Sequence, residues 1–239
     1  KKRSFHPKLW LVKYAGTGHE QGHTHYRLLI LSRNLTFDRS WDVAVCLEGK
    51  PHKKAHEKNY PLQDFFRFLL SWLKTGDKNA AEKRKILHAA IREIPNICFE
   101  LGNTRFSDFS FCPVGVSDSS NNTYSMESST LFEKYDELFV ISPFLSASGN
   151  GKNRNPIDLL NASGKPKSDK TLITRRSELP KLSDKALEDF NVYVMRDVII
   201  DGEETLSEGK EDESPKQQDI HAKLYLRTRN SDSELYIGS

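Results

Sequence analysis

Two short motifs, one near each end of the chain, combine side chains that could act on an anionic substrate. Each motif is His-x-Lys at the head of an apolar stretch, followed further on by a small polar residue. The residues are His6, Lys8, Ser32 and Asn34 in the first copy and His221, Lys223 and Ser239 in the second. Each copy therefore supplies an imidazole, an ammonium group and a hydroxyl or carboxamide. An imidazole can accept or donate a proton near neutral pH, and the other groups can hold an anion.

The sequence around each motif predicts a β-hairpin. After each His-x-Lys, apolar and polar residues alternate through two short runs that are separated by a turn. In a strand, residues two apart point to the same face, so His and Lys of one motif are expected side by side. Two such hairpins that faced each other would form one symmetric site.

This duplication resembles the phospholipase D superfamily, whose members carry two His-x-Lys motifs, each followed by Gly-Ser-x-Asn or a related sequence. The resemblance implies that one His attacks phosphorus and forms a phosphohistidine, while the other protonates the leaving oxygen. It also implies that the lysines and the Ser and Asn groups hold the non-bridging oxygens. We assign His6 as nucleophile and His221 as general acid, and the reverse order stays open.

The motifs depart from the common pattern of that superfamily at several positions. The usual Asp five residues after the Lys is replaced by Lys13 in the first copy and by Thr228 in the second. Leu31 stands where Gly is common, and no Asn follows Ser239, the last residue. Motifs without the Asp look more like tyrosyl-DNA phosphodiesterases and phospholipase D-type nucleases than like the lipases. We therefore expect nucleic acid, with DNA preferred, as the substrate.

The chemistry of phosphodiester cleavage accounts for these residue types. One His-x-Lys arises by chance in many proteins, whereas two copies in the same context are uncommon. A phosphodiester is a poor electrophile, so a covalent intermediate divides the reaction into easier steps. Cationic donors stabilise the charge that develops on the phosphoryl oxygens, and the two imidazoles need environments that separate their pKa values. The scheme requires no metal and no cofactor.

Three further residues are candidates for the same site. In related proteins a carboxylate near this position contacts the catalytic His, so Asp42 could orient His6, although a turn-capping role is equally compatible with its position. Ser142 and Ser146 follow the apolar run 137–141. Polar residues beyond the carboxyl end of such a strand lie where open α/β sheets bind ligands, although turn capping is the commoner role.

Strands and helices are predicted to alternate along the chain, which indicates an α/β fold. After the first hairpin, strands are predicted at 43–46, 97–101, 106–111, 137–141, 170–175 and 192–195. Helices are predicted from Pro61 to about Thr75 and at 80–93, 156–161 and 183–190. We expect two pseudo-equivalent, phospholipase D-like halves, each with a mixed sheet flanked by helices, at 1–127 and 128–239.

Composition sets outer limits on the function. Hydrophobic residues make up 36% of the 239 residues and charged residues 29%, with a net charge of +3. No apolar run is long enough to span a membrane, so we expect a protein without membrane association. The chain has three cysteines without metal-ligand spacing, which indicates a reducing, cytoplasmic setting. His19, His23 and His25 could suggest a metal site, but a hairpin tip with surface histidines is favoured.

These observations predict a phosphodiesterase that cleaves nucleic acid through a phosphohistidine. One alternative is a phospholipid hydrolase or transferase, which would need an apolar surface near the site. Another is a nucleic-acid-binding module that keeps the fold and lacks activity. Because the second motif is preceded by an α/β segment and the first by five residues, we expect the chain to be part of a longer protein with further domains.

Overall fold

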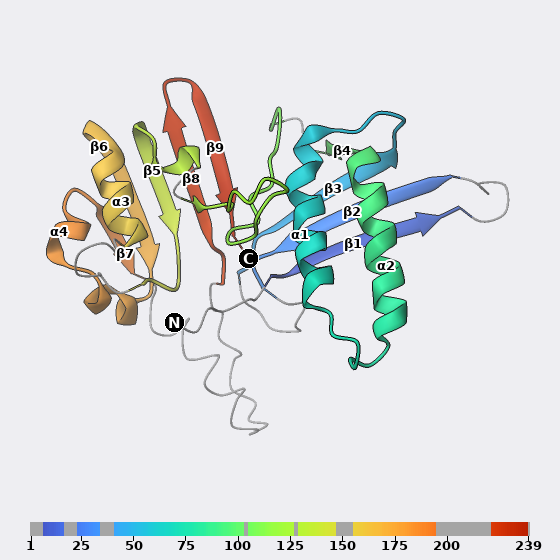
Figure 1. Ribbon diagram of the computed structural model, residues 1–239. Coiled ribbons are helices and arrows are strands. Elements are labelled where there is room, and N and C mark those ends of the chain that lie inside the picture. The colour runs from blue at the N-terminus through green and yellow to red at the C-terminus, as the bar shows by residue number, and fades with distance from the viewer. Residues whose placement is uncertain are drawn as a thin grey trace, which may run out of the picture. The chain divides into compact units, whose positions relative to one another are not determined.

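The computed structural model describes residues 7–16, 23–33, 41–102, 105–126, 129–146, 155–194 and 221–238. These residues form a mixed α/β structure with two β-sheets and flanking helices (Figure 1). The prediction of an α/β fold is therefore confirmed at this level. Among the helices of these segments, none is long and apolar enough to cross a membrane.

The chain divides into two compact units. One comprises residues 1–8, 30–45 and 130–239, and the other comprises residues 9–29 and 46–129. The units cut across the predicted halves, 1–127 and 128–239, because two N-terminal segments group with the C-terminal part of the chain. That the halves are separate domains stays a prediction.

The first sheet contains four strands in the order β1-β2-β3-β4. Their bounds are Leu9–Ala15, Thr24–Leu31, Ala44–Pro51 and Ile97–Leu101. The Gly16 amide donates to the His23 carbonyl (2.7 Å) and the Leu31 amide donates to the Lys8 carbonyl (3.0 Å), which closes both ends of the β1–β2 pair as a hairpin requires. The predicted hairpin and the strand at 97–101 are confirmed.

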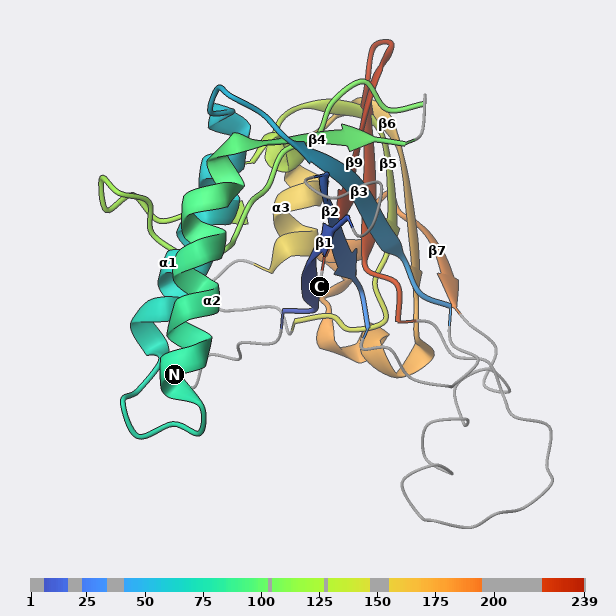
Figure 2. The same ribbon diagram turned by 90° about the vertical axis from the view of Figure 1, so that its right-hand side faces the viewer.

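Two helices lie side by side on one face of this sheet, α1 (Tyr60–Trp72) and α2 (Ala80–Glu93) (Figures 1 and 2). Pro61 lies in the first turn of α1, where its missing N–H removes no helical hydrogen bond. Helical spacing turns Leu62, Phe65 and Phe66 inward, and all three are buried. The predicted bounds of α2 match, and the short 3₁₀ helix that follows it contains Pro95.

The strand predicted at 106–111 is wrong, since these residues form no regular structure. Two phenylalanines of this segment, Phe109 and Phe111, pack against each other instead. The ring centroid of Phe111 lies 5.5 Å from that of Phe109 and 6.5 Å from that of Phe99, both in edge-to-face geometry. Aromatic clustering therefore replaces strand pairing in this segment.

The second sheet has the strand order β7-β6-β5-β8-β9. The bounds of β5 to β9 are Tyr135–Ile141, Gly164–Thr174, Asn191–Val194, Leu224–Arg229 and Asp232–Ile237. Strands β5, β6 and β7 are parallel, while β8 is antiparallel to both β5 and β9. The carboxyl ends of β5, β6, β7 and β9 and the start of β8 therefore meet at one edge of this sheet.

Two short helices accompany the second sheet, α3 (Pro156–Ser163) and α4 (Asp184–Leu187). Helix α3 is drawn against β5 and β6 in Figure 1, and the Tyr135 hydroxyl in β5 donates to the Leu160 carbonyl in α3 (2.7 Å). The helix predicted at 183–190 is confirmed only in part. It ends at Leu187 because the next residue, Glu188, leaves the helical region (φ −55°, ψ 133°), and Asp189 then adopts a left-handed conformation (φ 65°).

Four short 3₁₀ helices complete the regular structure of the described segments. Their bounds are Glu57–Asn59, Ile94–Asn96, Thr130–Phe132 and Arg176–Lys181. The last of them, η6, follows β6 after one residue, Arg175, and lies at the same edge of the second sheet as the start of β8. That edge positions the candidate site.

Candidate functional site

Both motif lysines stand at the same place relative to a strand. Strand β1 begins at Leu9, directly after Lys8, and strand β8 begins at Leu224, directly after Lys223. The sequence predicted His-x-Lys within the start of each strand. The structure instead places the described motif residues in irregular chain just before it, so their positions depend on neighbouring loops as well as on strand alternation.

Each copy contains an equivalent backbone hydrogen bond. In the first copy the amide of Leu31 donates to the carbonyl of Lys8 (3.0 Å), and in the second the amide of Gly238 donates to the carbonyl of Lys223 (3.1 Å). Each donor is the residue directly before a motif serine. The duplication seen in the sequence is therefore repeated in the backbone geometry. Ser239 itself lies outside the described residues.

In the first copy, Ser32 holds the beginning of the third strand. Its side chain is fully buried, its hydroxyl donates to the Asp42 carboxylate (3.1 Å), and the Val43 amide donates to the same hydroxyl (2.9 Å). Lys8 is also buried, with 8% of its surface exposed. His6 and Asn34 lie outside the described residues, so the predicted contact between Asp42 and His6 stays a prediction.

The second copy is attached to the segment that carries Asp42. The amides of His221 and Ala222 both donate to the carbonyl of Trp41 (3.0 and 3.2 Å). All of these residues belong to the same compact unit. The hydrogen bonds therefore bring the second His-x-Lys motif to the carboxylate that follows the first motif.

Charged groups from both copies interact at this point. Burial lowers the pKa of the Lys223 ammonium, and repulsion by Lys8 and then by Arg175 lowers it further, while attraction by Asp42 opposes these effects. Lys8, Lys223 and Arg175 thus form a cluster of cations drawn from three distant parts of the sequence. An anion bound among them would offset the repulsion that the cluster carries.

Phe144 and Arg175 are site residues that sequence reasoning missed. The Arg175 guanidinium carbon lies 4.7 Å from the Phe144 ring centroid, and the Lys223 ammonium nitrogen lies 5.4 Å from it. The ring of His221 is also 5.4 Å from that of Phe144. Phe144 follows β5 and Arg175 follows β6, so the signal that could have found them is their position just beyond two adjacent parallel strands.

The two serines predicted to contact substrate have different surroundings. Ser142 is buried, and its hydroxyl donates to the Phe144 carbonyl (2.8 Å). Its own carbonyl accepts from the Thr174 hydroxyl (2.7 Å). Ser146 is exposed, and its carbonyl accepts a hydrogen bond from the Asn155 side chain. Ser142 therefore holds the loop after β5 in place, and the binding role of both serines stays a prediction.

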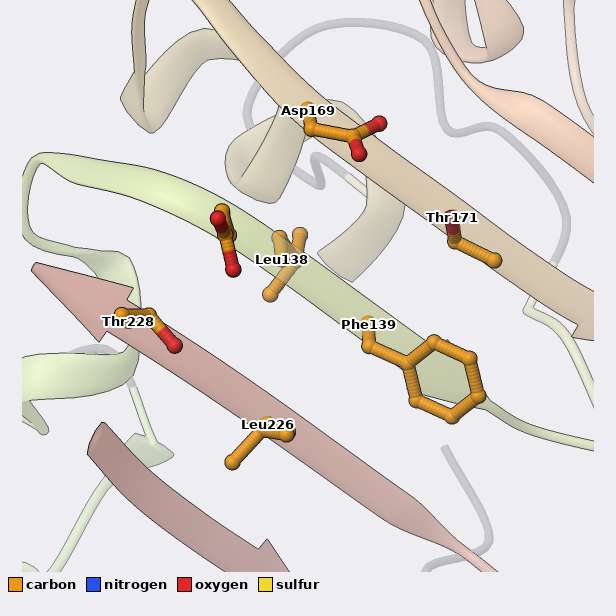
Figure 3. A pocket seen from close by; sticks show the side chains of 7 residues that line it. Leu138, Phe139, Asp169, Thr171, Leu226 and Thr228 are labelled. Carbon is orange, nitrogen blue, oxygen red and sulfur yellow. The ribbon is translucent and has the colours of Figure 1, made fainter.

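A hollow of about 140 Å³ opens on strands β5, β6 and β8 of the second sheet (Figure 3). It is lined by Glu137, Leu138, Phe139, Asp169, Thr171, Leu226 and Thr228. These residues precede the carboxyl ends of β5 and β6, whereas the cation cluster lies beyond those ends. The hollow is therefore separate from the candidate site.

Comparisons of the chain with models of known protein families, with curated proteins and with solved structures found no match.

Proposed function

We propose that the protein is a phosphodiesterase with a phospholipase D-like fold and mechanism, and that it cleaves phosphodiester bonds in nucleic acid. The strongest support for this proposal is the equivalent backbone hydrogen bond that each copy of the motif contains. In both, the residue before the motif serine donates to the carbonyl of the motif lysine. Each bond is a rung at the end of a strand pair, and what the two copies have in common is that the residue bonded to the motif lysine directly precedes the motif serine.

The cation cluster gives the proposed site its affinity for phosphate. The positive charges of Lys8 and Arg175 both repel the ammonium group of Lys223 and lower its pKa. A phosphodiester in the transition state spreads negative charge over its equatorial oxygens. Ammonium and guanidinium groups that are already positioned for those oxygens stabilise that charge without rearranging during the reaction.

The proposed reaction divides proton transfer between the two histidines. A nitrogen of neutral His6 attacks phosphorus, and the bond from phosphorus to the leaving oxygen breaks as His221 donates its proton to that oxygen. His221, now neutral, then removes a proton from water, and the resulting hydroxide displaces His6 from phosphorus. The cycle consumes one water, releases an alcohol and a phosphate monoester, and restores both imidazoles.

Labelled single- and double-stranded DNA, incubated with the purified protein in EDTA, tests this proposal. We expect cleavage by the wild type, loss of cleavage in His221→Ala and Lys223→Met, and unchanged cleavage in two matched controls. The controls are His88→Ala and Lys85→Met, both exposed on α2. Cleavage that returns only when Mg²⁺ is added would remove the two-histidine mechanism from consideration.

Two further measurements, of headgroup release from vesicles and of DNA binding, separate the alternatives. A phospholipid hydrolase or transferase would leave DNA intact and release the headgroup from phosphatidylcholine vesicles. A silent binding module would bind DNA with a strong dependence on salt and cleave neither substrate.

A further inference from the structure

We propose that Phe144 determines substrate specificity by stacking against the nucleobase next to the scissile phosphate. This inference rests on the proposed function and adds a base-binding element to the phosphate-binding cluster. The favoured substrate would therefore be a nucleic acid whose nucleotide next to the scissile phosphate carries its base.

Hydrogen bonds hold the loop that carries Phe144 both before and after this residue in the chain. Before it, the Ser142 amide donates to the Ile173 carbonyl (3.1 Å) and the Thr174 hydroxyl donates to the Ser142 carbonyl (2.7 Å). After it, the Leu145 amide donates to the Glu178 carboxylate (2.6 Å). The loop is thus joined to the end of β6 and to η6, and the backbone at Phe144 has little freedom.

The ring itself is left accessible on this fixed support. Ser142 and Leu145 are buried at 3% and 8% exposure, whereas 44% of Phe144 is exposed. A phenylalanine used only for packing would gain more by turning inward, because stabilisation grows with the apolar area removed from water. The fixed backbone instead presents the ring where a ligand can reach it.

Phe144 and its cationic neighbours together match the two chemical ends of a nucleotide. Arg175 and Lys223 approach Phe144 as cations, with distances of 4.7 and 5.4 Å to the ring centroid, and both belong to the cluster that would hold phosphate. A nucleotide joins an anionic phosphate and an aromatic base through one sugar. Because every base has a π-face, stacking on Phe144 would favour a base over no base and discriminate weakly among bases.

The contact with His221 places this platform beside the proposed general acid. The two rings are 5.4 Å apart and inclined at 61°. A base stacked on Phe144 would therefore lie close to the group that protonates the leaving oxygen. Stacking would orient the substrate relative to that proton as well as add affinity.

Oligothymidylates with and without a single abasic nucleotide test the proposal. For the wild type we expect kcat/KM at a linkage next to the abasic position to fall about tenfold, which corresponds to about 1.4 kcal/mol and lies within the range for one stacked base. In Phe144→Leu the intact and abasic strands should be cleaved equally, and Phe144→Trp should keep the preference. A Phe144→Leu enzyme with the wild-type preference, or one slowed equally on both strands, would overturn the proposal.

Binding separates failure of this inference from failure of the proposed function. Fluorescence anisotropy of a labelled intact or abasic strand measures the same preference without cleavage. If the wild type cleaves neither strand, the proposed function fails. A base preference in binding that Phe144→Leu removes and Phe144→Trp keeps would still support the stacking role. Equal binding of both strands by the wild type would refute it.

Discussion

Substitution of Ser32 by alanine should destabilise the protein because Ser32 joins two segments of the candidate site. The hydroxyl donates to Asp42 and accepts from the Val43 amide, at 3.1 and 2.9 Å. Asp42 is exposed, so water can replace the lost donor to its carboxylate. The amide of Val43, a half-buried residue, loses its acceptor. An unsatisfied buried donor costs about 1–3 kcal/mol, and because Val43 is only half-buried we expect a loss of free energy of unfolding at the low end of this range, about 1 kcal/mol.

Urea unfolding followed by circular dichroism measures this loss as a lower midpoint at unchanged slope. Ser233→Ala is the matched control, because its hydroxyl lies in hydrogen-bonding contact with Thr228 on an exposed hairpin at 3.1 Å. We expect the control to stay within about 0.5 kcal/mol of the wild type, as is usual for surface substitutions. A Ser32→Ala protein within that same range would refute the view that Ser32 fixes the start of the third strand.

Three further predictions concern the cation cluster and the first sheet. The pKa of Lys223 lies below its ordinary 10.5, so the folded protein binds fewer protons than the unfolded chain between these two values. The cost of its charge is therefore present at neutral pH and relieved as pH rises toward 10.5, and Lys223→Met should remove this rise in the urea midpoint. Lys8→Met should raise the pKa of Lys223 and Asp42→Asn should lower it further, which NMR titration of the lysine side chain would show. Gly49→Ala should cost about 1–3 kcal/mol in urea unfolding, because a Cβ at Gly49 would lie 2.6 Å from the Ile97 side chain. A change within about 0.5 kcal/mol would show that Ile97 moves aside.

Elements with a regular apolar period could be predicted from the sequence. The predicted bounds of α2 (Ala80–Glu93) and β4 (Ile97–Leu101) match the structure. A helix that begins near Pro61 was also expected, and α1 starts at Tyr60. In each case the local period, together with a proline or a glycine beyond the element, carries enough information without knowledge of the rest of the fold.

Features that depend on contacts between distant residues could not be predicted in this way. The segment 106–111 was expected to form a strand, but it has no strand partner among the described residues and its Phe109 and Phe111 rings pack edge to face. Phe144 and Arg175 became visible as partners only once β5 and β6 were known to be adjacent and parallel. The second motif is attached to the segment of Asp42 by the backbone carbonyl of Trp41, which accepts from the amides of His221 and Ala222. A backbone contact of this kind leaves no pattern in the side chains of the sequence.

The division of labour between the two histidines is the central claim, and an activated substrate tests it most directly. His6→Ala and His221→Ala are each assayed on DNA and on thymidine p-nitrophenyl phosphate, whose leaving group departs with little need for a proton. We predict that His6→Ala loses both activities, while His221→Ala loses cleavage of DNA and retains much of its activity on the nitrophenyl ester. The opposite pattern would exchange the roles of the two residues. Full activity of both variants on DNA would contradict the account and place the active site elsewhere.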